Sequence, residues 1–273
     1  MKIAVTIAKD APSHAPFILR GDYVDTIRRA GEIGYDAVEL HIADPHDIDV
    51  HAVLSACAEA RVSISSIGTG LAFVRDGVTL TNPELVRRQD ALNRLQAFIT
   101  LGQALNCVII IGLIRGQVRD IGDRAAFEAH LVEALGTCIP LAEAAGVTLV
   151  LEAVNRYESD VFNTIEETIA FLKRFNSLAF KLHIDTFHMN IEEPVIAASI
   201  AAAGGWIGHV HIADSNRLYP GQGHYDFPET LAALRAAGYQ GALSVECIGL
   251  PTSDEAAIGA LRFLRASLEQ PGL

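Results

Sequence analysis

Asp185 and His188 place a carboxylate and an imidazole three residues apart, directly after a short apolar run. Leu182 and Ile184 alternate with other residues in that run, which is typical of a buried strand. A strand that delivers these two groups at its carboxyl end is a candidate site for metal binding or proton transfer. The structural alternative is that Asp185 caps a turn and His188 packs in the core. The chemical interpretation gains weight because three other apolar runs carry similar groups.

Glu152, His211 and Glu246 occupy comparable positions in three further apolar runs. With Asp185 they place three carboxylates and one imidazole at the ends of four consecutive predicted strands. Structural zinc sites favour cysteine, whereas this donor set suits Mn²⁺, Mg²⁺ or Co²⁺ with positions left for water or substrate. Without a cation or shared protons, these carboxylates would repel each other strongly. We therefore predict one divalent metal site with these four ligands.

The four residues belong to a series of eight short β-rich runs separated by helical patterns. The predicted strands are Ile3–Ala8, Ala37–Ile42, Ser63–Gly68, Cys107–Gly112, Val147–Val154, Phe180–Asp185, Gly208–Asp214 and Ala242–Cys247. Eight strands alternating with eight helices favour an α/β fold, a single (β/α)8 TIM barrel over residues 1–273. The carboxyl ends of barrel strands converge on one mouth, where active sites form. An open doubly wound sheet is the alternative, but no glycine-rich phosphate turn follows the first strand.

Composition excludes several classes of partner. The net charge is −12, half of the residues are hydrophobic, and Lys and Arg form no cluster, so we expect no nucleic-acid partner. The longest apolar run, Cys107–Ile114, is far shorter than the ~20 residues of a membrane span. The amino-terminal segment has no secretory signal pattern, and the four cysteines form no CxxC pair. We expect a cytoplasmic protein with reduced thiols and no membrane partner.

Polar residues that follow the same strands predict a pocket for a hydroxyl-rich ligand. They are Asn155, Arg156, Glu158, His188, Asp214, Asn216 and Arg217. The segment Pro220–Phe227 is expected to close over the mouth, where His224 would reach the substrate or stay at the surface. His41 is expected at the mouth, and His183 and His209 share side-chain parity with predicted ligands, so they would line the barrel or support the metal site.

Several motifs resemble one known family, the sugar isomerase and epimerase barrels similar to xylose isomerase. Within it the ketose 3-epimerases of the D-tagatose and D-psicose type are most similar. The motifs span Leu151–Glu158, Asp185–Glu193, His209–Phe227 and Ser244–Cys247. Two segments of the amino-terminal half resemble a branch that acts on keto-sugar acids, such as 5-keto-L-gluconate epimerase. These segments are Ile67–Thr81 and Val108–Gly116.

The resemblance implies roles for individual residues. The four predicted ligands would bind one divalent cation, usually manganese. Glu152 and Glu246 would also be the acid/base pair: one removes the proton beside the carbonyl, and the other returns a proton to the opposite face of a metal-stabilised cis-enediolate. Glu158, His188 and Arg217 would hold substrate oxygens next to the carbonyl.

Arg115 follows the fourth predicted strand, and we expect it to bind a substrate carboxylate through a bidentate contact. A surface ion pair is the alternative for this arginine. The expected partner is a small sugar or keto-sugar acid, and the resemblance implies a homo-oligomer, either a dimer or a tetramer. The sequence leaves open whether the substrate is a ketose, a keto acid or a phosphorylated ketose.

Three alternative functions fit parts of the pattern. An aldose–ketose isomerase, including the hydroxypyruvate type, would use the same barrel. An apurinic-site endonuclease would need histidines after the third and fourth strands, where this chain has Gly68 and Gly112. A non-catalytic sugar-binding barrel would not require the paired acids Glu152 and Glu246.

Overall fold

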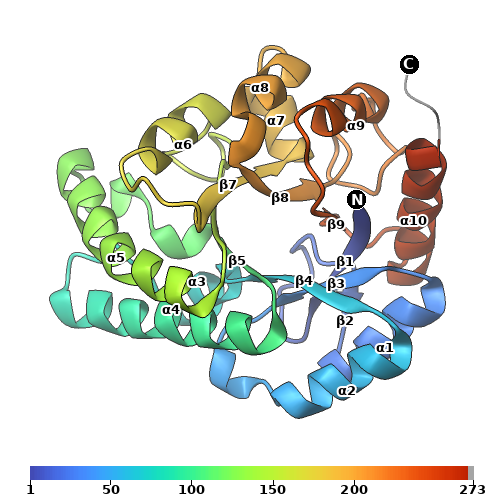
Figure 1. The fold of residues 1–273 in the computed structure, drawn as a ribbon, viewed down its shortest axis with the longest axis horizontal. Coiled ribbons are helices and arrows are strands. Elements are labelled where there is room, and N and C mark those ends of the chain that lie inside the picture. The colour runs from blue at the N-terminus through green and yellow to red at the C-terminus, as the bar shows by residue number, and fades with distance from the viewer. Residues whose placement is uncertain (270–273) are drawn as a thin grey trace.

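In the computed structural model, which describes residues 1–269, nine parallel strands form one sheet that closes into a barrel (Figure 1). The strands are β1 (Lys2–Ala8), β2 (Leu19–Arg20), β3 (Ala37–His41), β4 (Ser63–Gly68), β5 (Val108–Ile111), β6 (Leu149–Glu152), β7 (Phe180–Asp185), β8 (Ile207–Ile212) and β9 (Ala242–Val245). β1 pairs with β3 on one side and with β9 on the other, which closes the ring. The predicted (β/α)8 barrel is confirmed, and its eight strands lie within two residues of their predicted bounds.

The short strand β2 was not predicted. β9 pairs with Lys2–Val5 of β1, whereas β2 pairs with Ile7 and Ala8 farther along the same strand. β2 therefore continues the closing seam at the carboxyl end of β1. Two residues are too few to leave a recognisable alternation in the sequence.

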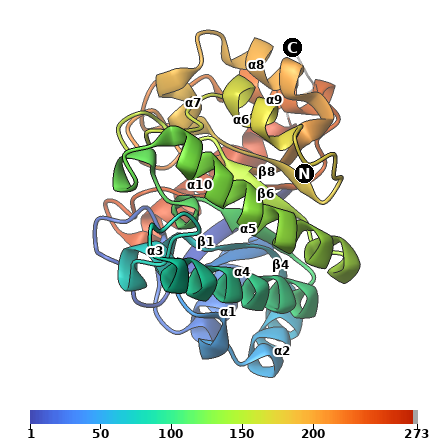
Figure 2. The same ribbon diagram turned by 90° about the vertical axis from the view of Figure 1, so that its left-hand side faces the viewer.

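Helices surround the barrel on all sides (Figures 1 and 2). They are α1 (Tyr23–Ile33), α2 (Val50–Ala60), α3 (Gly70–Asp76), α4 (Leu85–Leu105), α5 (Arg124–Ala145), α6 (Ile165–Leu172), α7 (Thr186–Glu192), α8 (Ile196–Ala203), α9 (Phe227–Ala236) and α10 (Ser253–Glu269). The short helices α3 and α7 follow β4 and β7 closely and bring side chains to the mouth. Across residues 1–269, no helix has both the length and the apolarity needed to cross a bilayer.

The interior of the barrel contains a polar layer as well as aliphatic side chains. Its buried polar residues are Thr6, Glu39, Ser66, His183, His209, His211 and Ser244. Strand register makes several of them neighbours, because Glu39 pairs with Ser66 and His183 pairs with His209. Buried polar groups favour hydrogen-bond partners, and Glu39, Ser66, His209 and His211 form one such network within this layer.

Candidate active site

The four predicted metal ligands meet at the carboxyl end of the barrel. Glu152 ends β6, Asp185 ends β7, His211 lies in β8 and Glu246 directly follows β9. A carboxylate oxygen of Glu152, one of Asp185 and a ring nitrogen of His211 all lie within 4.8 Å of one another. His211 Nδ1 lies 3.3 Å from Glu246 Oε2 and 3.9 Å from Asp185 Oδ2. The structure therefore brings the four residues into one cluster.

The two carboxylate oxygens of Asp185 have different neighbours. Oδ1 accepts a hydrogen bond from the backbone N–H of Phe187 at 2.8 Å and so caps α7. Oδ2 faces the cluster, 3.9 Å from His211 Nδ1. The cap and the predicted ligand role are compatible, because the cap fixes the carboxyl group while leaving the other oxygen directed into the mouth.

His188 directs its Nε2 into the cluster, 3.7 Å from Glu152 Oε1 and 3.8 Å from Asp185 Oδ2. Asn155 Nδ2 donates to His188 Nδ1 at 2.7 Å and to Glu158 Oε1 at 2.9 Å. Burial lowers the pKa of His188, which favours the neutral ring. A neutral imidazole that accepts at Nδ1 carries its proton on Nε2, so His188 offers an N–H donor to a ligand in the mouth.

Arg217 places a guanidinium beside the predicted ligands. Its terminal nitrogens donate to Asp185 Oδ2 and Glu246 Oε2, and its charge lies 4.9 Å from the centre of the Phe187 ring. Burial alone would lower the pKa of Arg217, but the two carboxylates raise it. The backbone φ of 62° lies in the left-handed region, which costs a non-glycine residue roughly 1–2 kcal/mol. Such strain is concentrated at functional sites.

The environment separates the pKa values of Glu152 and Glu246. Burial, together with the nearby carboxylates of Glu246 and Asp185, raises the pKa of Glu152 to about 8. Burial also acts to raise the pKa of Glu246, but His211 and Arg217 outweigh it and lower that pKa to about 2. Two carboxyl groups whose pKa values are driven apart are typical of an acid/base pair.

Glu39 is a buried acid of β3 that the sequence interpretation did not single out. Its Oε1 accepts hydrogen bonds from Nε2 of His41 and of His211, both at 2.7 Å. Its Oε2 accepts from His209 Nε2 at 2.7 Å and from Ser66 Oγ at 2.5 Å. Burial would raise the pKa of Glu39, but the three histidines lower it well below its ordinary value. One signal was available, because a charged residue in the middle of an otherwise apolar strand needs buried partners.

A cavity of about 160 Å³ is lined by three of the four clustered residues, Glu152, His211 and Glu246. Its polar lining consists of His14, His41, Thr69, Glu152, Glu158, His188, His211, Arg217 and Glu246. Its apolar lining includes Pro12, Ala15, Pro16, Phe17, Leu71, Val74, Ile110, Leu113 and Val154. The predicted substrate residues Glu158, His188 and Arg217 therefore face the same space as the predicted ligands Glu152, His211 and Glu246.

The segment Pro220–Phe227 does not line this cavity, contrary to expectation. His224 is exposed, and its Nδ1 lies 3.0 Å from Ser215 Oγ. Asp214 holds the segment in place by accepting backbone N–H groups of Gly221 and Tyr225. The amino-terminal segment Pro12–Phe17 lines the cavity instead, and the sequence interpretation missed it.

The position of Arg115 corrects the expectation that it binds a substrate carboxylate. Its side chain is fully buried and is absent from the lining of the cavity. Its guanidinium donates to the carbonyl oxygens of Glu152 at 3.0 Å and Val161 at 3.2 Å, and to Ser159 Oγ at 3.0 Å. Burial lowers the pKa of Arg115 to about 10. The arginine thus stabilises the loop after β6 rather than reaching a ligand.

The cluster fits a divalent cation in two respects. His211 Nδ1 is buried and, among the residues that the structure describes, finds no hydrogen-bond partner, although carboxylate oxygens surround it. Three carboxylates and an imidazole are also the donors that Mn²⁺, Mg²⁺ and Co²⁺ accept. Gly112 leaves the room that Glu152 needs, since a Cβ at Gly112 would lie 2.7 Å from Glu152 Oε2.

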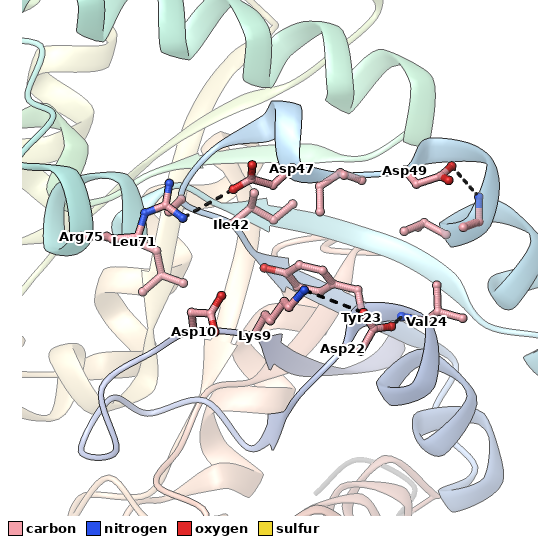
Figure 3. Close-up of a pocket in the computed structure, with 14 residues that line it drawn as sticks. Lys9, Asp10, Asp22, Tyr23, Val24, Ile42, Asp47, Asp49, Leu71 and Arg75 are labelled. Atoms are coloured by element: carbon pink, nitrogen blue, oxygen red, sulfur yellow. Dashed lines mark hydrogen bonds and ion pairs between the residues drawn. The ribbon is translucent and has the colours of Figure 1, made fainter.

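A second, larger cavity of about 370 Å³ lies nearby (Figure 3). Lys9 and Asp22 lie 4.0 Å apart in its wall, and Arg75 lies 3.5 Å from Asp47. Leu71 lines both cavities. The larger cavity contains none of the predicted site residues, so its size alone does not make it the site of chemistry.

Several known proteins are similar to this chain. Residues 27–267 match the family model described as xylose isomerase-like TIM barrel. The D-psicose 3-epimerase of Agrobacterium fabrum is 40% identical over 233 residues, 81% of this chain and 77% of that protein. The L-ribulose 3-epimerase of Methylomonas sp. is 36% identical over 222 residues, 81% of this chain and 76% of that protein. The solved D-allulose 3-epimerase from Methylomonas sp. in complex with D-allulose has a TM-score of 0.81 at 27% identity, and the match covers 98% of each chain.

Proposed function

Because the chain belongs to the family of xylose isomerase-like TIM barrels, we propose that it is a metal-dependent 3-epimerase of a neutral ketose. It is an epimerase, and hence an isomerase, as are its relatives that act on L-ribulose and D-psicose. One observation carries the proposal: Glu152, His211 and Glu246 line one cavity, and His211 Nδ1, which has no hydrogen-bond partner among the described residues, lies 3.9 Å from Asp185 Oδ2. This arrangement combines a cation site with two carboxyl groups suited to proton transfer.

The predicted ligands Glu152, Asp185, His211 and Glu246 would hold the cation. When bound there, a divalent ion would supply Lewis-acid chemistry that withdraws electron density from a ketose carbonyl and so acidifies the C–H bond of the carbon next to it. Glu152 and Glu246 extend from β6 and β9, with the two intervening strands contributing Asp185 and His211. We assign removal of the C3 proton to one glutamate and delivery of a proton to the opposite face to the other, which inverts carbon 3.

Three further residues orient the sugar. His188 offers its Nε2–H beside Glu152, and Asn155 fixes that ring by donating to Nδ1. Asn155 also holds the carboxylate of Glu158, which is positioned to accept a substrate hydroxyl. Arg217 supplies guanidinium donors at the same wall of the cavity. Together these groups recognise the oxygens next to the carbonyl, where the chemistry takes place.

The charge of the lining favours a neutral sugar over an acid or a phosphate. Arg217 is the one Lys or Arg among the cavity-lining residues that the structure describes, and Asp185 and Glu246 already pair with it. A carboxylate or phosphate needs such a cation or a nest of backbone N–H groups. With Arg115 buried elsewhere, we favour a ketose over the keto-sugar acid that the sequence left open.

Proton exchange tests the proposal. The protein, loaded with Mn²⁺, Co²⁺ or Mg²⁺, would be incubated in D2O with ketopentoses, ketohexoses and 5-keto-hexonic acids, and quenched samples freed of metal would be examined by NMR. We expect deuterium at C3 together with a C3-inverted ketose, and no exchange after treatment with EDTA. Formation of an aldose would favour the isomerase alternative, and preferred turnover of a keto acid would contradict the neutral-ketose assignment. Manganese as the ion, a homo-oligomeric assembly and a cytoplasmic location stay predictions.

A further inference from the structure

Glu39 connects the interior of the barrel to the proposed metal centre. Its side chain is fully buried, and along the sheet β1 separates its strand β3 from β9, which Glu246 directly follows. Four donors satisfy it: His41 and His211 at Oε1, and His209 and Ser66 at Oε2. Since an ionised carboxylate only accepts hydrogen bonds, each of the three imidazoles must donate its Nε2–H to Glu39.

We propose that Glu39 is a positioning residue of the metal centre: it holds Nε2–H of His211 so that Nδ1 faces Asp185 and Glu246. The inference rests on the proposed function, because it concerns the cation that those residues would share. The two nitrogens of His211 have different surroundings. Nε2 lies 2.7 Å from Glu39 Oε1, whereas Nδ1 lies 3.9 Å from Asp185 Oδ2 and 3.3 Å from Glu246 Oε2. A hydrogen bond at one ring nitrogen determines which nitrogen is free to bind a metal.

The packing around His211 supports a fixed ring. The His183 ring meets it edge to face, with ring centres 4.1 Å apart and planes at 87°. His183 makes no hydrogen bond with any residue that the structure describes, so it contacts His211 through packing. Glu39 therefore supplies the hydrogen bond that sets the orientation of His211, and His183 occupies the space into which the ring would otherwise turn.

Glu39 also holds His41, a second residue that lines the cavity. The His41 ring stacks near Phe17 with centres 4.1 Å apart, and its Nε2 lies 3.7 Å from Glu246 Oε1. Gly68 makes room for this ring, because a Cβ there would lie 2.4 Å from His41 Nδ1. One carboxylate oxygen of Glu39 thus fixes both a predicted ligand and a residue beside the second glutamate of the acid/base pair.

A purely structural role explains this arrangement less well. Burying a carboxylate and three imidazoles carries a desolvation cost, and well-packed apolar residues of similar volume often give equal or greater stability. A carboxylate behind a metal-binding histidine, in contrast, raises the basicity of the ring and fixes its direction. The buried polar residues around Glu39 therefore lie where they can set the basicity and the direction of the His211 ring.

The test compares Glu39→Gln with Ser66→Ala. Ser66 binds the other oxygen of the same carboxylate, so its loss perturbs Glu39 without touching the bond to His211. Mn²⁺ binding to the metal-free proteins would be measured by calorimetry without any sugar, alongside circular dichroism and thermal unfolding. We expect Glu39→Gln to weaken Mn²⁺ binding by about 10–100-fold, and Ser66→Ala to change it by less than about 3-fold, because Ser66 lies outside the metal–histidine–carboxylate chain.

Wild-type protein provides a second test that does not depend on a variant folding. In ¹⁵N-histidine-labelled protein loaded with diamagnetic Mg²⁺, His211 should carry its proton on Nε2, with Nδ1 unprotonated. A proton on Nδ1, or wild-type Mn²⁺ affinity in folded Glu39→Gln, would overturn the inference and leave the proposed function standing. Wild-type protein that binds no Mn²⁺ at all would overturn both.

Discussion

Arg217 and Glu246 form a buried ion pair at the point where the four predicted metal ligands converge. The same guanidinium also pairs with Asp185, so one positive charge already partly neutralises the cluster. A divalent cation entering the site would compete with Arg217 for these oxygens and would be repelled by its charge.

Replacing Arg217 by Gln should therefore strengthen metal binding while weakening catalysis. We expect Mn²⁺ affinity to rise several-fold, since two carboxylates lose their internal partner, and ketose turnover to fall by at least about 10-fold because a substrate donor is lost. Calorimetry and steady-state kinetics measure the two effects separately.

Arg156→Gln is the matched control for this substitution. Arg156 pairs with Glu192, but its side chain is 62% exposed, so its loss should leave both quantities nearly unchanged. Weaker metal binding in a folded Arg217→Gln protein would contradict the expected competition between Arg217 and the cation for the carboxylate oxygens. It would show instead that the arginine orients the ligands.

The separated pKa values of Glu152 and Glu246 predict opposite effects of pH on the metal-free protein. The folded-state pKa of Glu152, about 8, exceeds its ordinary value of 4.5, so the folded state binds this proton more tightly. Glu152 therefore reduces stability as pH rises from 4.5 to 8. Glu152→Gln should raise Tm by ~2 °C or more at pH 8 in EDTA, and the gain should vanish near pH 4.5.

Glu246→Gln should behave in the opposite way. The pKa of Glu246 is lowered from 4.5 to about 2, so its ionised form stabilises the folded state above pH 4.5, and this contribution is lost as pH falls through 2. Removing the charge should lower Tm at pH 8, with a smaller effect near pH 3. Melting curves that shift in the same direction for both variants would contradict this account of the site.

Arg115→Met tests the corrected role of that arginine. Its guanidinium donates to the carbonyl oxygens of Glu152 and Val161, which would lose this donor, although Val161 would still accept from Ser159 Oγ. We expect a stability loss of roughly 3 kcal/mol, from chemical denaturation. In the protein that remains folded, the ratio of KM values for keto acids and neutral ketoses should not change. A selective rise in KM for keto acids would restore the substrate role predicted from the sequence.

Gly112→Ala should impair function more than stability. A Cβ at Gly112 would meet the end of the flexible Glu152 side chain at 2.7 Å, so the carboxylate can move aside with little effect on Tm. Since that movement takes Glu152 out of the cluster, we expect turnover to fall at least about 10-fold, with weaker Mn²⁺ binding. Gly136→Ala is the control, because a Cβ at this position in α5 meets nothing within 4 Å. Equal turnover in both variants would show that the position of Glu152 is not critical.

The sequence determined the fold and the main cluster because both follow from local patterns. Eight short apolar runs separated by helices leave few arrangements other than a barrel. In a barrel, the carboxyl ends of parallel strands converge, so Glu152, Asp185, His211 and Glu246 had to approach one another. Neither step requires knowledge of how a particular side chain is oriented.

Only the tertiary structure shows which groups Glu39, Arg115 and the segment Pro12–Phe17 contact. Glu39 gains its importance from His41 on its own strand and from donors on β4 and β8, which are far from it in the sequence. Arg115 follows a strand end as the predicted ligands do, but its side chain turns behind β6 to backbone carbonyls. Strand position fixes where a Cα lies, whereas the direction of a long side chain depends on which buried partners the surrounding fold supplies.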